Sequence, residues 1–299
     1  MRHDLLSLEL FVAVAECGNV TRAAGRKHLA VSAVSKRIAE LEDLTGSPLL
    51  VRQARGVRLT AAGQSLLHHA RDVLRAVHGL EEELGRYASG MKGHVRLHAI
   101  ASALTQWLPG ELQSFLRDHP DVQVSLEERT GKAVLRAVAD GSADIGIVAG
   151  AGQGSGLAVF PYRRDRLHLG VPAGHPLARR KRVAFAEALG HAFVGPLAES
   201  SLLVLMQDAA RAAGRPLRQQ IQVSSFDVMC RMVETGLGVT LLPADVLAPY
   251  ARDGRLRTVA VTDAWAERRL SIVAREREAL SHVTRALVAH LQAPATDVG

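Results

Sequence analysis

Basic and hydroxyl side chains gather between residues 20 and 60, where they could bind an anionic partner. This stretch holds three acidic residues and eight basic ones, namely Arg22, Arg26, Lys27, Lys36, Arg37, Arg52, Arg55 and Arg58. Arg and Lys pair with phosphate oxygens, and Arg, Lys and Ser also hydrogen-bond to base edges in the major groove. Since the whole chain carries a formal net charge of +7, much of its excess lies in this one segment. The segment therefore favours a nucleic acid as partner.

Three short helices are expected to position these side chains. Residues 5–17 have apolar residues at helical spacing, and Thr21 stands in an N-cap position for a second helix that runs to about residue 29. Alanines at 23 and 24 allow two helices to cross closely. Val34, Ile38 and Leu41 predict a third helix with one apolar stripe. The opposite face of that helix carries Ser32, Ser35, Lys36 and Arg37, which is typical of a helix-turn-helix.

Four segments, in this order and at this spacing, resemble the signature of LysR-type transcriptional regulators: residues 21–25 (TRAAG), 33–42 (AVSKRIAELE), 46–52 (GSPLLVR) and 56–63 (GVRLTAAG). The resemblance implies that the third helix enters the major groove and that residues 49–59 form a β-wing beside it. The DNA-binding residues it implies are Thr21, Arg22, Ser32, Ala33, Ser35, Lys36, Arg37, Arg52, Arg55 and Arg58. In many family members Ser-Gln-Pro opens the recognition helix, whereas this chain has Ala30, Val31 and Ser32. The preferred DNA sequence therefore does not carry over, and Lys36, Arg55 and Arg58 could each be an ordinary solvated charge.

A long helix is expected from Thr60, which would cap it. Apolar residues recur along this helix at spacings of four and three, as in the seam of a coiled coil: Leu66, Ala70, Val73, Val77, Leu80 and Leu84. We expect the seam to join two chains, and a dimer would match an operator with two-fold symmetry. Packing of the helix on its own domain is the alternative. The family resemblance implies a dimer of dimers.

The remainder of the chain reads as alternating strands and helices after a glycine-containing hinge at residues 89–93. Strands are expected at 95–100, 122–127, 145–148, 166–171, 192–195, 220–223 and 238–242, and helices at 104–118, 131–140, 184–189, 202–213 and 226–235. Such alternation is typical of βαβ units around parallel sheets. Residues 93–97, 140–147, 174–177 and 236–243 resemble landmarks of the LysR effector domain, whose fold is similar to type 2 periplasmic binding proteins.

The expected fold class is thus α/β with a helix-rich N-terminal part. We expect a winged helix-turn-helix over residues 1–60, a linker and dimerisation helix over 61–88, the hinge, and a two-lobed effector-binding domain over 94–299. Lobe 1 would comprise residues 94–162 and 265–292, and lobe 2 residues 163–264.

Polar side chains at predicted strand ends suggest where a small molecule binds. Ser102, Ser200, Ser201, Ser224 and Ser225 each follow a predicted strand at the start of a helix, and Thr130 is a further contact by the family pattern. In open α/β sheets a ligand lies outside the carboxyl ends of the strands, and helix N-termini there favour anions. A small carboxylate effector between the lobes is therefore expected. Plain helix capping by these serines is the alternative.

Several other classes of function are disfavoured. The glycine-rich residues 150–156 fit no nucleotide-binding motif, and neither a GxSxG nor an HExxH motif occurs, so we expect a flexible crossover there, no cofactor and no catalytic residues. His68 and His69 cannot face one ligand from a helix, and with only Cys17 and Cys230 we expect no metal and no disulfide. The basic run at Arg163, Arg164, Arg166 and 179–182 is interpreted as solvated.

These observations predict a cytoplasmic regulator with no membrane segment and no export signal. Its expected partners are double-stranded promoter DNA, a small-molecule effector, further copies of the chain and RNA polymerase. A transporter's solute-binding protein and an enzyme built on the lobes are the competing hypotheses. The basic N-terminal segment argues against the first, and the lack of a nucleophile with a nearby base argues against the second.

Overall fold

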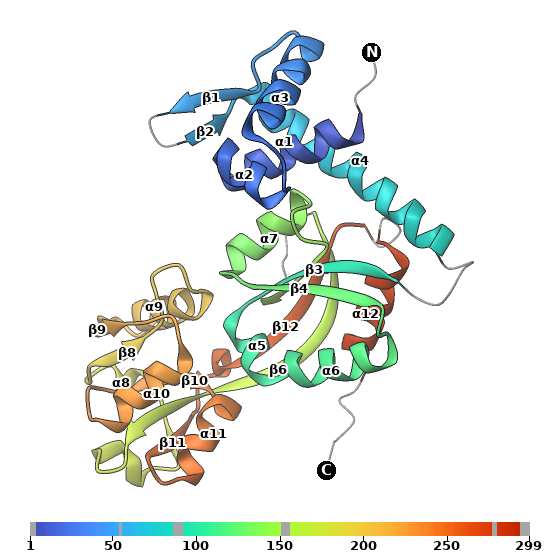
Figure 1. Cartoon of the computed structure of the whole chain (residues 1–299). Coiled ribbons are helices and arrows are strands. Elements are labelled where there is room, and N and C mark those ends of the chain that lie inside the picture. The colour runs from blue at the N-terminus through green and yellow to red at the C-terminus, as the bar shows by residue number, and fades with distance from the viewer. Residues whose placement is uncertain (1–3, 54–55, 86–91, 151–155, 277–279, 294–299) are drawn as a thin grey trace. The chain divides into compact units, whose positions relative to one another are not determined.

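The structure is a computed structural model that describes residues 4–53, 56–85, 92–150, 156–276 and 280–293. It contains two compact units, one of residues 1–90 with 140–142 and the other of residues 91–139 with 143–299 (Figure 1). Three sequence predictions fall on residues outside the described ranges: the wing residue Arg55, most of the hinge at 89–93, and the flexible crossover at 151–155. The first unit, of residues 1–90 with 140–142, is called the N-terminal unit below, and the second the effector unit.

The N-terminal unit is built from four helices and a hairpin, α1 (Leu5–Cys17), α2 (Val20–Arg26), α3 (Val31–Thr45), β1 (Leu50–Gln53), β2 (Gly56–Leu59) and α4 (Ala61–Gly85). The predicted stripe of Val34, Ile38 and Leu41 is buried, and it packs with Phe11 and Val14 in one hydrophobic core. Ala23 and Ala24 are buried at the same core, as expected for a close helix crossing. The three-helix arrangement with a β-wing is therefore confirmed.

Of the two helix caps predicted in this unit, one is confirmed and the other is wrong. Thr60 caps α4, because its Oγ1 accepts a hydrogen bond from the backbone N–H of Gly63 at 2.9 Å. The prediction that Thr21 caps α2 is wrong. Asn19 does so instead, accepting from the N–H of Arg22 at 3.1 Å. Gly18, in the left-handed conformation, ends α1, and α2 starts two residues later at Val20. Thr21 therefore lies inside the first turn of α2.

The effector unit begins with β3 (Gly93–Ala99), β4 (Val122–Glu128) and β5 (Ile145–Ala149), with the helices α5 (Ala101–Gln106), α6 (Leu108–Asp118) and α7 (Gly131–Ala139) between them. The single helix expected over 104–118 is wrong, because the chain breaks at Trp107. Pro109 is the reason, since it has no N–H to donate and fits only in the first turn of a new helix.

The rest of the unit contains β6 (Ala158–Pro172), a short 3-10 turn η1 (Pro176–Arg179), and a series of shorter elements. These are β7 (Arg182–Val183), α8 (Phe185–Ala188), β8 (Phe193–Gly195), α9 (Ser201–Ala212), β9 (Gln219–Gln222), α10 (Phe226–Glu234), β10 (Thr240–Pro243), α11 (Ala244–Arg252), β11 (Leu256–Val261), η2 (Ala264–Ala266), β12 (Glu267–Ala274) and α12 (His282–Gln292). None of the helices in the described ranges is long and apolar enough to cross a membrane.

The sheet is mixed, so the parallel pairing expected from the alternation describes only part of it. Its strand order is β4-β3-β5-β12-β6-β11-β7, and β10 also pairs with β6. β3 runs parallel to β4 and β5, whereas β10, β11 and β12 all run antiparallel to β6. β11 pairs with residues 168–172 of β6 and β12 with residues 158–166. β6 therefore pairs with β12 along its first part and with β11 along its last part. Because these pairs are antiparallel, they need no crossover helix.

Two hydrophobic cores lie at the two ends of β6. One contains Leu97, Phe115 and Ile272 and includes Tyr162 of β6. The other contains Phe193 and Met206 and includes Leu167, Leu169 and Val171 of β6. In Figure 1, β6 and β12 run side by side, and β6 continues from the group of β3, β4 and α6 to the group of α10, α11 and β11. β6 therefore joins the two lobes.

Candidate nucleic-acid interface and effector site

The outer face of α3 presents the short polar and basic side chains that the sequence singled out. Ser32, Ala33 and Lys36 are exposed, whereas Ser35 is half-buried. Lys36 extends into solvent and approaches only Glu40 one turn later, with its Nζ 3.9 Å from the carboxylate. An exposed pair of this kind contributes little and leaves the lysine available to a phosphate. This face of α3 is therefore accessible to a partner.

Arg37 is held differently from its neighbours on α3. Its Nη1 lies 3.1 Å from the Asp4 carboxylate and 3.1 Å from the Ser7 hydroxyl, both at the start of α1. Asp4 also caps α1 by accepting from the backbone N–H of Ser7 at 2.9 Å. Hydrogen bonds from Ser7, together with the charge of Arg37, lower the pKa of Asp4. Arg37 therefore ties α3 to α1.

Thr21 and Arg22 lie at the start of α2, and both are exposed. The Arg22 guanidinium donates to the carbonyl of Cys17 at the end of α1. A cation beside a helix C-terminus is favourable because the last carbonyls carry a partial negative charge. Arg22 thus contributes to the joint between α1 and α2, while Thr21 is the less constrained of the two.

The wing is a two-stranded ribbon that is anchored to α1. Arg52 pairs with Val57 and Val51 with Arg58, so Arg52 and Arg58 lie on opposite faces of the ribbon. Both arginines are exposed. Gly56 has a φ of +115°, and a Cβ there would lie 2.2 Å from the carbonyl oxygen of Gly18. Only glycine permits this approach, which holds the wing against the end of α1.

Several residues of the family-like motifs position the wing without facing a partner. Glu42 accepts hydrogen bonds from the backbone N–H groups of Leu49 and Leu50, at 2.7 and 3.1 Å. A Cβ on Gly63 would lie 2.1 Å from the Leu49 carbonyl oxygen, so glycine is required there as well. The sequence reasoning quoted these residues as motif letters and missed their role. Glu42 and Gly63 therefore fix the position of the wing between α3 and α4.

The predicted seam of α4 divides into two parts. Ala70 is buried in the core of the N-terminal unit and Leu66 packs against that core. Further along, Val77 is half-buried, Val73 is 43% exposed and Leu80 is 55% exposed. The side chain of Leu84 lies outside the described set. Among the seam residues whose side chains are described, Val73 and Leu80 are therefore available to a partner.

Ser102, the first of the predicted effector contacts, faces a buried ion pair. Arg268 on β12 and Asp165 on β6 lie opposite each other in the strand register, and both are 7% exposed. The Arg268 Nε donates to Asp165 at 2.8 Å, and its Nη2 donates to the Ser102 hydroxyl at 3.0 Å. Gln106 adds a longer contact of 3.4 Å to the same carboxylate. Ser102 does not cap α5, for which Ile100 is the N-cap residue.

The other predicted effector residues lie at the starts of three helices. Thr130 directly precedes α7, and a Cβ on its neighbour Gly131 would lie 3.8 Å from the Cβ of Ser201. The starts of α7 and α9 are therefore close together. Ser200 caps α9 by accepting from the N–H of Leu202 at 3.2 Å, and Ser225 caps α10. Ser224 is exposed beside Ser225.

Sequence reasoning missed Arg268 and Asp165, although one signal was present. Arg268 stands in phase with the apolar residues Leu270 and Ile272 at every second position of the strand, and all three are buried. A charged residue on the buried face of a strand requires a partner, so its presence predicts a second buried charge. The sequence does not identify Asp165 as that second charge, because the two residues lie far apart along the chain.

The comparisons with known proteins agree with this geometry. The family described as the LysR substrate binding domain matches residues 88–295, and the bacterial regulatory helix-turn-helix of the lysR family matches residues 5–64. The chain belongs to the LysR family of transcriptional regulators. LysR regulators are DNA-binding proteins with an effector-binding domain and are not enzymes, so the predicted family, fold class and absence of enzymatic function are confirmed.

Two LysR relatives illustrate the range of the similarity. The uncharacterised regulator YnfL of Escherichia coli is 30% identical, over 89% of this chain and 91% of its own. The hydrogen peroxide-inducible genes activator of Pectobacterium carotovorum is also 30% identical, over 84% of this chain and 83% of its own.

Solved structures of LysR regulators share the fold across the whole chain. Full-length OxyR from Pseudomonas aeruginosa has a TM-score of 0.78 at 21% identity, covering 99% of this chain and 96% of its own. Full-length CbnR in complex with its target DNA has a TM-score of 0.66 at 21% identity, covering 97% of this chain and 99% of its own.

Proposed function

We propose that this LysR regulator binds promoter DNA as a dimer or a dimer of dimers, and that a small carboxylate in its effector domain controls it. The observation that carries the first part is the exposed face of α3 beside the exposed wing arginines. Ser32, Ala33 and Lys36 would face the major groove, and Arg52 and Arg58 the flanking backbone. A protein with this role acts on the chromosome, which places it in the bacterial cytoplasm. RNA polymerase, which binds the same promoters, is a further candidate partner.

Ser102 supports the preference for a carboxylate. A guanidinium only donates hydrogen bonds, so the Ser102 oxygen must be the acceptor from Arg268. The single hydroxyl proton then has no acceptor among the residues that the structure describes. A ligand with an acceptor oxygen would take this proton, and a carboxylate forms the stronger bond. Backbone N–H groups at the starts of α7 and α9, which lie close together, are further candidate donors, because helix N-termini favour anions.

DNA binding can be tested with the segment upstream of the regulator's own gene. In fluorescence anisotropy we expect binding that weakens steeply as salt rises, because phosphate contacts release counterions. Arg52→Ala should weaken binding and flatten the salt slope by roughly one, because this wing arginine would contact one phosphate of the flanking backbone. Arg179→Ala, an exposed arginine of the effector unit, is the matched control and should behave as the parent. Absence of binding even at low salt would overturn this part of the proposal.

The effector part has a separate test. A panel of small carboxylates and their amides is titrated into the full chain by calorimetry, first on the parent and then on Ser102→Ala. We expect at least one carboxylate to bind more tightly than its amide and to lose about tenfold in affinity in the variant, which corresponds to one hydrogen bond to a charged group. If Ser102→Ala binds that carboxylate as the parent does, Ser102 is not part of the site.

A further inference from the structure

The start of α3 carries apolar side chains that solvent can reach. Val31, the first residue of α3, is 41% exposed, and Leu29, two residues before it, is 40% exposed. Both lie outside the hydrophobic core of the N-terminal unit, whose members on α3 begin at Val34. The start of α3 therefore displays hydrocarbon to solvent.

Val31 shares one side of α3 with two serines that are expected to face DNA. Residues four apart are neighbours on a helix surface, so Val31 stands next to Ser35, and Ser32 follows it directly in the chain. A groove that brings base edges to these two serines also brings them to Val31. Val31 is not among the DNA-binding residues that the sequence predicted.

The backbone at the start of α3 is suited to a close approach to DNA. Ala30 occupies the N-cap position, and its side chain forms no hydrogen bond to the first turn. Within the described part of the chain, the first N–H groups of α3 therefore have no side-chain cap. Phosphate oxygens bind at helix N-termini, so a DNA phosphate can accept from these N–H groups. Such a contact would hold Val31 at the edge of the groove.

The chemistry of valine restricts what Val31 can recognise there. Its side chain has neither a donor nor an acceptor, so it cannot read the hydrogen-bonding groups of a base pair. Thymine presents a 5-methyl group in the major groove, and apolar side chains contact this group. A β-branched side chain has one strongly preferred rotamer in a helix, so the methyl groups of Val31 point in a fixed direction.

We propose that Val31 is a specificity-determining residue, which packs against the 5-methyl group of a thymine in the major groove. This inference rests on the proposed entry of α3 into that groove. A cytosine at the same place has no methyl group and would leave Val31 uncovered. Burial of one methyl group corresponds to about a fourfold difference in affinity.

The test removes the thymine methyl groups and leaves base pairing unchanged. The segment upstream of the regulator's own gene is prepared with deoxyuridine in place of thymidine, and both forms are titrated with the full-length protein by fluorescence anisotropy. The parent should bind the uracil form at least about fourfold more weakly than the thymine form. Val31→Ala should bind the thymine form more weakly than the parent does, and its further loss on the uracil form should be smaller. Comparing the two losses isolates the contact, because an effect of uracil on DNA shape is common to both proteins.

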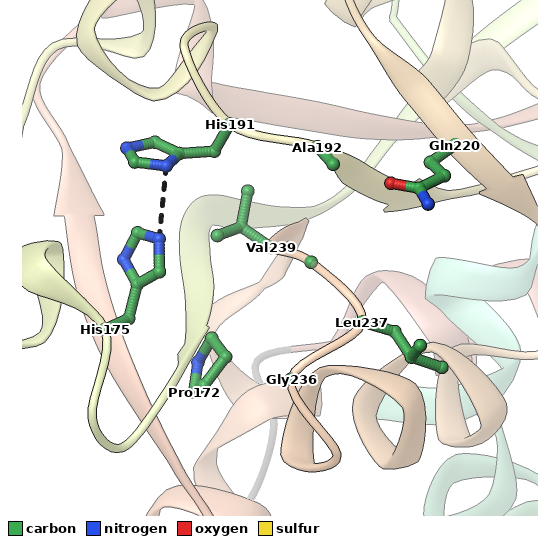
Figure 2. Close-up of a pocket in the computed structure, with 9 residues that line it drawn as sticks. Pro172, His175, His191, Ala192, Gln220, Gly236, Leu237 and Val239 are labelled. Carbon is green, nitrogen blue, oxygen red and sulfur yellow. Dashed lines mark hydrogen bonds between the residues drawn. The ribbon is translucent and has the colours of Figure 1, made fainter.

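Two further variants are controls. Val31→Ile keeps a β-branched apolar side chain and should retain the sensitivity of the parent to uracil. Leu237→Ala shortens a side chain that is 47% exposed in the effector unit, where Leu237 lines a pocket with Pro172 and Val239 (Figure 2). No DNA contact is proposed for Leu237, so this variant should behave as the parent with both forms of DNA.

Two results would overturn this inference alone. One is equal affinity of the parent for the thymine and uracil forms, which needs no variant. The other is a loss on the uracil form that is as large in Val31→Ala as in the parent. If the parent binds neither form at low salt, the proposed DNA binding is wrong and this inference is wrong with it.

Discussion

The thiol of Cys230 lies in the core of the lobe that contains Phe193 and Met206, with no exposed surface. Burial, followed by the charges of Asp227 and Glu234, raises its pKa to about 12. Oxidation by peroxide requires a thiolate that solvent can reach. The only other cysteine, Cys17, lies in the N-terminal unit. The effector unit therefore holds no cysteine that peroxide could readily oxidise in the folded protein.

We accordingly predict that Cys230 resists thiol reagents in the native protein. Labelling with a chromogenic disulfide, followed by peptide mass spectrometry, should modify Cys230 only after denaturation. Cys230→Ala should leave any response of DNA binding to hydrogen peroxide unchanged. Rapid native labelling of Cys230, or loss of a peroxide response in the alanine variant, would contradict the burial argument.

The histidines His168 and His175 give the free energy of unfolding a defined dependence on pH. Burial is the main cause that lowers the pKa of each below the usual 6.5. The unfolded chain therefore binds protons first as the pH falls, and the unfolding free energy decreases below about pH 6.5. Carboxyl groups with lowered pKa, such as Asp4 and Asp227, act in the same direction but only at lower pH.

We expect the urea concentration at the midpoint of unfolding of the effector unit to decrease as the pH is lowered from 7.5 to 5. The double variant His168→Gln with His175→Gln should show a flatter profile over this range. If the urea midpoint of the parent does not change with pH, or changes as steeply in the double variant, then groups other than these two histidines control its pH dependence.

Single residues also show where sequence reasoning reaches its limit. The outward placement of Ser32 and Lys36 was predictable, because helical spacing fixes which side chains oppose the buried stripe. The pairing of Arg37 with Asp4 was not, because it depends on how two helices cross. Likewise Ser102 looked like a cap or a ligand contact, and its bond to Arg268 required a strand far along the chain.

At the scale of elements, the apolar seam of α4 is buried at one end and exposed further along. Leu66 and Ala70 serve the core of the N-terminal unit, while Val73 and Leu80 remain exposed. The heptad spacing predicted a seam, but spacing alone cannot tell a partner helix from the chain's own core. The alternative, packing on the chain's own domain, holds for Leu66 and Ala70, and the coiled-coil pairing stays a prediction for Val73 and Leu80.

We predict that Leu80→Asp weakens self-association. Burying a leucine contributes about 1.5–3 kcal/mol, so its loss should raise the dimer dissociation constant at least about tenfold. Analytical ultracentrifugation over a concentration series measures this constant. Ala76→Asp adds the same charge at an exposed position of α4 that is not part of the seam, and it is the matched control. Equal effects of the two substitutions would mean that charge, and not the seam, controls assembly.

The long strand β6 was only partly predictable from the sequence. Most helices and short strands could be located from periodicity and glycine signals, because those depend on neighbouring residues. β6 was expected only as 166–171, since Arg163, Arg164 and Asp165 interrupt its apolar pattern. Partners from β11 and β12 hold this strand in place, and such pairing over nearly one hundred residues leaves little trace in local sequence.

Over the whole effector unit, the Arg268–Asp165 pair lies where the two lobes are joined by β6. Removing one partner leaves a buried charge, which typically costs about 3–5 kcal/mol, whereas replacing both by apolar residues costs far less. We therefore predict that Asp165→Asn lowers the unfolding free energy of this unit by about 3–5 kcal/mol. Asp165→Leu combined with Arg268→Met should recover most of that loss.

The two tryptophans allow this prediction to be tested for each lobe separately. Trp107 packs at the core that contains Phe115, and Trp265 packs edge-on to Phe185 at the other core. In Trp107→Phe and Trp265→Phe backgrounds, urea unfolding followed by fluorescence then reports a single lobe. Because β6 contributes side chains to both cores, Asp165→Asn should shift both midpoints by similar amounts relative to their own backgrounds. A shift confined to one tryptophan would mean that the lobes unfold independently and that the pair stabilises only one of them.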